Sequence, residues 1–243
     1  MVKGTRVIEG VIFDLDDTLA YIKVDWERLR SRVRELYSRF NIALQFKPIL
    51  QHIDEATTTL TQKCGRTRAK DVRSEALAII EEFALEGARK AVPNEGASDL
   101  LRYCRNLGLK IGILSRNARK AVLTTIHRCN FGSFIDVVMA REDCAKYKPD
   151  PLPVLETAER LGVKTHNLVV IGDHPYDITS GREAGAITIG VLTGIPPRED
   201  LESAGADYIA SNLGAIIPII SALTGVSAEI KEEGFDKSIP DYS

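Results

Sequence analysis

The sequence predicts an α/β protein with a doubly wound, mostly parallel sheet and an inserted α-helical unit. Two observations lead to this fold class. Short apolar runs alternate with helical patterns along most of the 243 residues, and one long interval between the first two runs carries helical patterns only. Strands that alternate with helices imply a parallel sheet covered by helices on both faces.

Six apolar runs are expected to form the sheet. They lie at residues 7–13, 109–115, 136–140, 167–173, 186–191 and 206–210. Two helices between them are indicated by apolar residues that share a face and by a glycine at the end, which is a common helix stop. These are Leu100, Leu101, Cys104 and Leu107 before Gly108, and Leu152, Leu155, Ala158 and Leu161 before Gly162.

The interval between the first two strands is too long for a simple crossover, which needs only about a dozen residues. It shows three helical patterns: one from Trp26 to Phe40 after a possible cap at Asp25, one that starts at Pro48, and one over 72–83. We therefore predict an α-helical cap domain over residues 20–94. The α/β core domain would comprise residues 1–19 and 95–243.

Composition limits the function classes. Lys and Arg total 32 against 34 Asp and Glu, so no positive excess is available for nucleic-acid binding. The four cysteines form no Cys-x-x-Cys pair or zinc spacing, which is typical of reduced thiols in a cytoplasmic protein. We expect no membrane association, because the most apolar late segment is short and contains Pro218.

Polar residues stand where the predicted strands end. Asp14 follows the first strand, Ser115 ends the second, and Asp173 ends the fourth. In open parallel sheets, ligands bind outside the carboxyl ends of the strands. With the common Rossmann-like order 3-2-1-4-5-6, these three residues share one crevice. Mg²⁺ would neutralise Asp14 and Asp173 together, because it prefers oxygen ligands, and a nearby lysine would offset more negative charge.

Four segments occur in the order of a known set of motifs. They are DLDDTL (14–19), ILSRN (113–117), KPDP (148–151) and GDHPYD (172–177). With them and its helical insert, the chain resembles the haloacid dehalogenase-like (HAD) hydrolase superfamily, particularly its phosphoglycolate-phosphatase-like members.

The resemblance implies a role for each motif residue. Asp14 would be the nucleophile and Asp16 the general acid and base. Ser115, Asn117 and Lys148 would bind the substrate phosphate. The metal ligands would be Asp14, Asp173 and the backbone carbonyl of Asp16, with Asp177 supporting them from the metal shell.

Two positions depart from the common family pattern. Asp17 stands where many relatives have Gly, and Arg116 follows Ser115 where Asn is frequent. The sequence leaves open whether Asn117 reaches the phosphate or caps the following helix, since Asn is a favoured N-cap. It also leaves open whether His174 touches substrate.

We therefore expect a Mg²⁺-dependent phosphatase that acts on a small phosphorylated metabolite through an aspartyl-phosphate. Phosphoglycolate is the leading candidate by resemblance, and sugar phosphates and nucleoside monophosphates compete with it. The alternatives are a sugar-phosphate mutase of the same superfamily and a receiver-like signalling module. A haloacid dehalogenase is disfavoured, because such enzymes generally lack the acid at the Asp16 position. The expected assembly is a monomer or homodimer.

Overall fold

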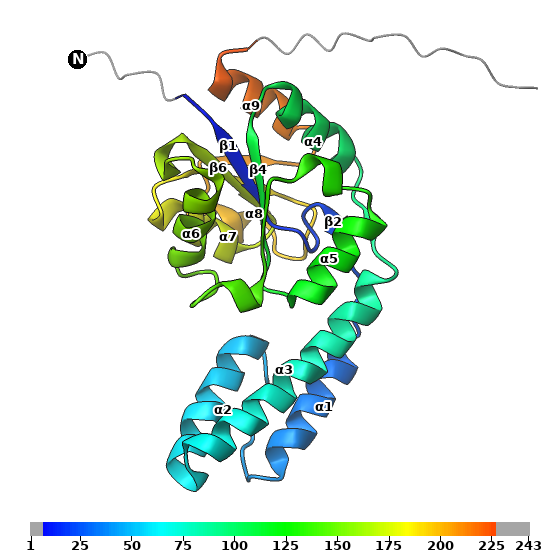
Figure 1. Cartoon of the computed structure of the whole chain (residues 1–243), viewed down its shortest axis with the longest axis vertical. Coiled ribbons are helices and arrows are strands. Elements are labelled where there is room, and N and C mark those ends of the chain that lie inside the picture. Colours follow the sequence, from blue (N-terminus) through cyan, green and yellow to red (C-terminus); the bar gives the residue numbers. More distant parts are fainter. Residues whose placement is uncertain (1–6, 227–243) are drawn as a thin grey trace, which may run out of the picture.

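The protein consists of a parallel sheet flanked by helices and a group of three helices beside it. The computed structural model describes residues 7–226. In Figure 1 the sheet and its helices form the upper part, and α1, α2 and α3 form the lower part. Among the described residues, no helix has both the length and the apolar character needed to cross a membrane.

The main sheet has six parallel strands in the order β5-β4-β1-β6-β7-β8. Numbered along the chain within this sheet, that is the predicted order 3-2-1-4-5-6, so the predicted fold class is confirmed. The strands are β1 (Gly10–Phe13), β4 (Lys110–Leu114), β5 (Val137–Met139), β6 (Leu168–Gly172), β7 (Ile187–Val191) and β8 (Tyr208–Ala210).

Helices cover both faces of this sheet. Side chains alternate along β1, so Val11 and Phe13 belong to the cluster shared with α4, α5 and α9, whereas Ile12 belongs to the cluster shared with α6. The helices of the two faces are α4 (Ala97–Asn106), α5 (Arg119–Arg128), α6 (Leu152–Leu161), α7 (Pro175–Glu183), α8 (Arg198–Ser203) and α9 (Ile216–Thr224). Three short 3₁₀ turns lie at Gly132–Phe134, Arg141–Asp143 and Thr165–Asn167.

The predicted stops of α4 and α6 hold, because Gly108 and Gly162 both take positive φ angles just after the helices. Leu155 is an exception to the predicted apolar face of α6. It is 42% exposed, whereas Ala158 and Leu161 are buried against the sheet. The register of α6 is set by Val154 and Ala158, which leaves Leu155 on the outer side.

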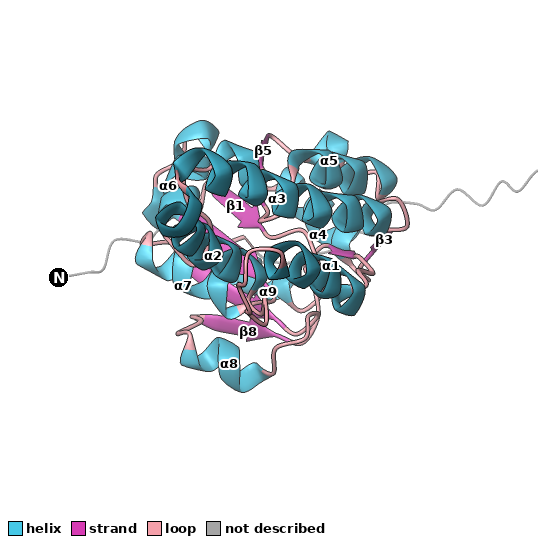
Figure 2. Cartoon of the chain, turned by 90° about the horizontal axis from the view of Figure 1, so that it is seen from below, coloured by secondary structure: helices cyan, strands magenta, loops and turns pink. Residues whose placement is uncertain are grey.

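The inserted helices are α1 (Trp26–Ser38), α2 (Ile49–Cys64) and α3 (Arg66–Ala88), as the three patterns predicted. The Asp25 side chain caps α1 by accepting a hydrogen bond from Arg28 N at 3.0 Å. Buried residues of the three helices form their own cluster around Ile53 and Leu60. Seen from below, these helices lie across the end of the sheet (Figure 2).

One expectation for this interval was wrong. Residues 20–95 contain two very short strands, β2 (Ala20–Tyr21) and β3 (Val92–Pro93), which pair antiparallel where the chain leaves and re-enters the core. Two residues are too few to show the period of a strand. The domain boundaries at 20–94 remain a prediction, and the predicted core ranges extend into 1–6 and 227–243, outside the described residues.

The cluster of the inserted helices should contribute strongly to stability. Ile53 is fully buried there, so Ile53→Ala is expected to lower the free energy of unfolding by about 2–5 kcal/mol. The matched control is Thr58→Ala on the exposed face of α2, expected to change it by less than about 0.5 kcal/mol. Urea unfolding followed by circular dichroism measures both, and equal losses would show that this cluster is not a packed core.

Candidate active site

The register of three neighbouring strands brings the predicted residues together. Phe13 of β1 is aligned with Ile113 of β4 and Ile171 of β6. The three parallel strands therefore end at the same edge of the sheet, and Asp14, Ser115 and Asp173 follow there. Asp14 N also donates to Ile171 O at 2.9 Å, which fixes the backbone of Asp14 against β6.

A buried lysine joins two carboxylates at this edge. Lys148 Nζ donates to Asp14 Oδ1 at 2.6 Å, to Asp177 Oδ1 at 2.5 Å and to Leu114 O at 2.8 Å. Its side chain is only 3% exposed. Burial alone lowers the pKa of Lys148, but the carboxylates of Asp14 and Asp177 outweigh it and raise that pKa, so the ammonium stays charged.

Asp14 is held in a crowded acidic setting. Burial raises the pKa of the Asp14 carboxyl well above its usual range. Lys148 opposes this rise, whereas the neighbouring carboxylates of Asp177 and Asp173 add to it. Like charges this close disfavour ionisation unless a further positive charge compensates them. The site thus has a deficit of positive charge in the absence of a bound cation.

Asp16 lies in a different hydrogen-bond environment two residues further on. Its Oδ2 accepts from Ser115 Oγ at 3.0 Å and from Asn117 Nδ2 at 2.7 Å. Burial raises the pKa of Asp16, and the two hydrogen bonds partly offset that rise. A carboxyl with a raised pKa holds its proton more readily, which suits a general acid.

The structure settles one alternative for Asn117. The N-cap residue of α5 is Ala118, which makes no side-chain capping bond. Asn117 instead contacts Asp16, and its own N–H donates to Ser115 Oγ at 3.1 Å. Asn117 is therefore part of the acidic site and not a helix cap.

Asp173 is fixed by a hydroxyl and by a glycine. Thr18 Oγ1 donates to Asp173 Oδ1 at 2.5 Å and accepts from Asp173 N at 3.1 Å. A Cβ on Gly194 would overlap Asp173 Oδ2, so the backbone after β7 packs directly against this carboxylate. Burial, with a further contribution from Asp177, raises the pKa of Asp173 to about 7.

Asp177 lies in the first turn of α7. Its Oδ2 accepts from His174 N at 3.1 Å, while its Oδ1 accepts from Lys148. The His174 Nδ1 atom accepts from Tyr176 N at 3.1 Å, so His174 serves as the N-cap of α7. Burial lowers the pKa of His174, which favours this neutral, accepting form.

Three carboxylates are close enough together to share one cation. Asp14, Asp173 and Asp177 each offer an oxygen, and these atoms all lie within 4.8 Å of one another. Such a set of buried oxygen donors with uncompensated charge fits a hard divalent ion such as Mg²⁺. The Asp16 carboxylate is not in this group.

Sequence reasoning gave no role to three residues that hold the site. Thr18 orients Asp173, Gly194 makes room for it, and Asn94 Nδ2 donates to the carbonyls of Asp17 at 2.9 Å and Thr18 at 2.8 Å. Only Thr18 carried a signal, as the last letter of the D-x-D-x-T pattern. Asp17 has a φ of 62°, a left-handed backbone conformation that Gly adopts more readily than other residues.

The fold and the site are those of an α/β enzyme that works at the carboxyl ends of its strands. The chain belongs to the haloacid dehalogenase-like hydrolase family, whose model matches residues 11–191. The predicted family membership is thereby confirmed.

Individual relatives support the prediction of a phosphatase. Pyrophosphatase PpaX of Bacillus mycoides is 26% identical over 219 residues, which cover 90% of this chain and 99% of the relative. The solved structure of a hydrolase from Pseudomonas syringae has a TM-score of 0.66 at 21% identity and covers 90% of this chain and 100% of its own. A structure named as a predicted phosphoglycolate phosphatase from Haemophilus somnus has a TM-score of 0.63 at 15% identity, covering 88% and 98%.

The raised pKa of Asp173 predicts that the free energy of unfolding falls as the pH rises in cation-free buffer. The ordinary pKa of Asp is about 3.9, so between about pH 4 and 7 the folded state binds more protons than the unfolded state and loses stability as the pH rises. Asp173→Asn cannot ionise and its oxygen still accepts from Thr18. We expect this variant to be more stable than the native protein at about pH 8 with chelator, and equal to it near pH 4. Thermal unfolding measures this, and a less stable variant at the higher pH would contradict it.

The contact between Gly194 and Asp173 predicts that even one methyl group will disturb the site. Gly194→Ala must displace the Asp173 carboxylate and is expected to weaken Mg²⁺ binding by about 10- to 100-fold. Isothermal titration calorimetry measures the affinity. The control is Gly132→Ala, because a Cβ there meets nothing within 4 Å. Unchanged affinity in Gly194→Ala would show that Asp173 does not hold the ion.

Proposed function

We propose that this protein is a Mg²⁺-dependent phosphatase that hydrolyses a small phosphate monoester through an aspartyl-phosphate on Asp14. The observation that carries the proposal is the difference between two nearby carboxyls. The pKa of both carboxyls is raised, but Asp14 Oδ1 is paired with the Lys148 ammonium at 2.6 Å, whereas Asp16 accepts hydrogen bonds from the neutral side chains of Ser115 and Asn117. One carboxyl is prepared to attack and the other to carry a proton.

In the first half-reaction, an Asp14 oxygen attacks phosphorus, and the bond from phosphorus to the leaving oxygen breaks. Asp16, protonated, gives its proton to that leaving oxygen, so an alcohol departs. Ser115 and Asn117 can then turn from Asp16 to the phosphoryl oxygens, since their hydroxyl and amide groups are donors. Lys148 keeps a positive charge beside Asp14 throughout.

In the second half-reaction, Asp16 is a carboxylate and acts as a base. It removes a proton from water, which attacks phosphorus and releases Asp14 and inorganic phosphate. Asp14, Asp173 and the Asp16 carbonyl would hold Mg²⁺, with Asp177 supporting. The ion supplies charge stabilisation for the phosphoryl oxygens during transfer.

Residues 20–94, with the three inserted helices, would form a cap domain that excludes water from the site and selects the leaving group. Phosphoglycolate leads the candidate substrates by family resemblance, with sugar phosphates and nucleoside monophosphates as competitors. The names of the relatives add pyrophosphate to this panel. A cytoplasmic location agrees with the four free cysteines, Cys64, Cys104, Cys129 and Cys144.

Replacing the nucleophile should abolish turnover. Asp14→Asn is expected to lower phosphate release from p-nitrophenyl phosphate and from the substrate panel by roughly 1,000-fold or more. Asp17→Asn is the matched control, because it changes a carboxylate of the same turn without touching the proposed chemistry. We expect it to keep activity within about threefold.

Phosphate release is measured with Mg²⁺ and with chelator. Full turnover by Asp14→Asn would exclude the covalent mechanism. Formation of a phosphate isomer in place of free phosphate would indicate a mutase, and an aspartyl-phosphate that persists for hours without turnover would indicate a receiver-like module.

A further inference from the structure

Two partly buried arginines lie beside the site and have no role in the reaction proposed above. Arg116 directly follows Ser115, and Arg141 begins the short turn after β5. Arg141 lies outside the four motifs. Arg116 lies within one of them, at a position to which the resemblance gives no role. Each has a buried nitrogen without a hydrogen-bond partner among the residues that the structure describes.

Among residues 7–226, no carboxylate forms an ion pair with the Arg116 guanidinium, and those of Asp177 and Asp14 act on it from a longer distance. Its guanidinium lies between two aromatic rings, 4.9 Å from the centroid of Tyr176 and 5.7 Å from that of Tyr147. Its one hydrogen bond in the described residues runs from Nη2 to Gln51 Oε1 of α2 at 3.3 Å, and Nε has none. Burial lowers the pKa of this guanidinium. The group is therefore held in place, desolvated and short of an anion.

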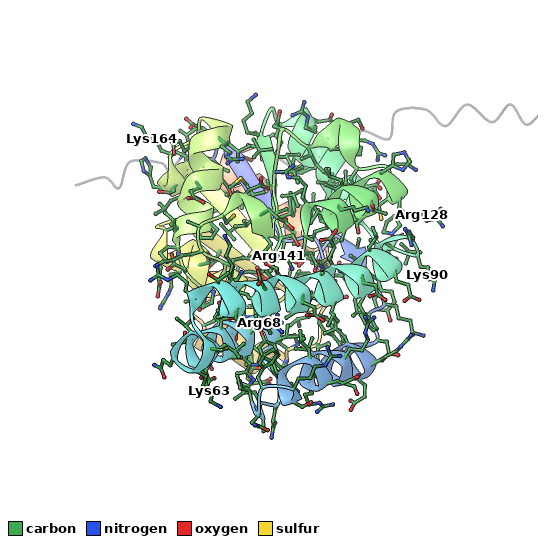
Figure 3. The ribbon with its side chains drawn as sticks, turned by 60° about the horizontal axis from the view of Figure 1, so that its bottom comes forward. Lys63, Arg68, Lys90, Arg128, Arg141 and Lys164 are labelled. Carbon is green, nitrogen blue, oxygen red and sulfur yellow. The ribbon has the colours of Figure 1, made fainter. Side chains whose placement is uncertain are left out.

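Arg141 is in a similar state. Its side chain is only 10% exposed, and Nη1 has no partner in residues 7–226. Its ion pair joins Nη2 to the half-exposed Glu142 at 3.4 Å, which is a long contact. Figure 3 labels Arg141 where the core meets α3. An exposed and loosely held carboxylate compensates a buried guanidinium only weakly.

Arg116 and Arg141 line the same small cavity. Its volume is about 10 Å³, and Ser115, Tyr147 and Lys148 also line it. That volume holds one oxygen-sized group and not a whole carboxylate or phosphate, so an anionic group could enter only if these side chains move apart. Ser115 and Lys148 belong to the proposed phosphate site, and the bond from Arg116 to Gln51 marks the side that faces the inserted helices. The cavity therefore lies next to the phosphate, on the side where a leaving group would extend.

A buried arginine that lacks an anion is costly, and a planar guanidinium matches the two oxygens of a carboxylate or phosphate. We propose that Arg116 and Arg141 form a subsite for a second anionic group on the leaving-group side of the substrate. This inference rests on the proposed phosphatase function and narrows its substrate class to phosphate compounds with a second anionic oxygen group. Monoesters with a neutral leaving group lack the partner that this subsite requires.

The test compares matched substrates with Mg²⁺ present. Phosphoglycolate supplies a carboxylate, pyrophosphate and a sugar bisphosphate supply a second phosphate, and ethyl phosphate supplies neither. The native protein is expected to show a kcat/KM for at least one anionic class about 10- to 100-fold above that for ethyl phosphate. The substrate class with the larger kcat/KM relative to ethyl phosphate identifies whether the subsite binds a carboxylate or a phosphate.

Substitution tests the residues themselves. Arg116→Gln and Arg141→Gln are each expected to remove about tenfold or more of that preference, while ethyl phosphate hydrolysis changes less than threefold. Arg116→Lys and Arg141→Lys keep the positive charge and should fold even if the Gln variants do not. They are expected to lose part of the preference for anionic substrates. Lys146→Gln is the matched control, because Lys146 lines the same cavity but is 62% exposed and paired with Asp150 at 2.7 Å. It should leave the preference unchanged.

The outcomes separate the two proposals. If the arginine variants lose kcat/KM equally on anionic and neutral substrates, or if no arginine variant loses any, the subsite is overturned and the proposed phosphatase function stands. Equal kcat/KM values of the native protein for ethyl phosphate, phosphoglycolate, pyrophosphate and the sugar bisphosphate would also overturn the subsite. A native protein inert on every phosphate compound would overturn the phosphatase, and the subsite with it.

Discussion

The site depends on the ammonium group of one buried lysine. Lys148 pairs with Asp14, which follows β1, and with Asp177 in the first turn of α7, and each carboxylate would be costly there without it. It supplies one positive charge against four carboxylates, since Asp16 and Asp173 also lie in the site. Burial, with a further contribution from neighbouring carboxylates, raises the pKa values of Asp14, Asp16 and Asp173, so these groups hold protons more readily in the absence of a cation. A divalent cation would replace those protons, which is why the same cluster can be a strain on the fold and a binding site.

This arrangement is possible because neighbouring strands in a parallel sheet end together. Asp14, Ser115 and Asp173 are far apart in sequence, and the register of β1 with β4 and β6 brings them to one edge. The inserted helices leave and return beside the same edge, through β2 and β3. Asn94, at the return, holds the carbonyls of Asp17 and Thr18, so the connection to the inserted helices and the acidic turn are one hydrogen-bonded unit.

The sequence predicts those parts of the molecule that depend on local pattern. Apolar runs locate all six strands of the main sheet, and the position of Asp14, Ser115 and Asp173 at strand ends follows once the strand order is assumed. Contacts between distant loops leave no such pattern. Gly194 is indistinguishable in sequence from a turn glycine, yet it is required by Asp173, and Asn94 contacts a turn 76 residues away through one amide. Asn117 was ambiguous because the same amide suits a helix cap and a carboxylate.

Contacts between the core and the inserted helices bear on how substrate specificity could arise. Arg116 lies against the rings of Tyr147 and Tyr176, and Tyr147 in turn contacts the inserted helices. Two residues of α2 contact the core: Gln51 accepts a hydrogen bond from Arg116, and Asp54 accepts one from the Tyr147 hydroxyl. Asp54 also accepts a hydrogen bond from Arg73 of α3. Opening of these helices would break the contacts of Gln51 and Asp54, whereas the contact of Arg116 with Tyr176 lies within the core. A charged substrate would therefore meet a preformed cationic group first, and closure of the helices would follow its binding.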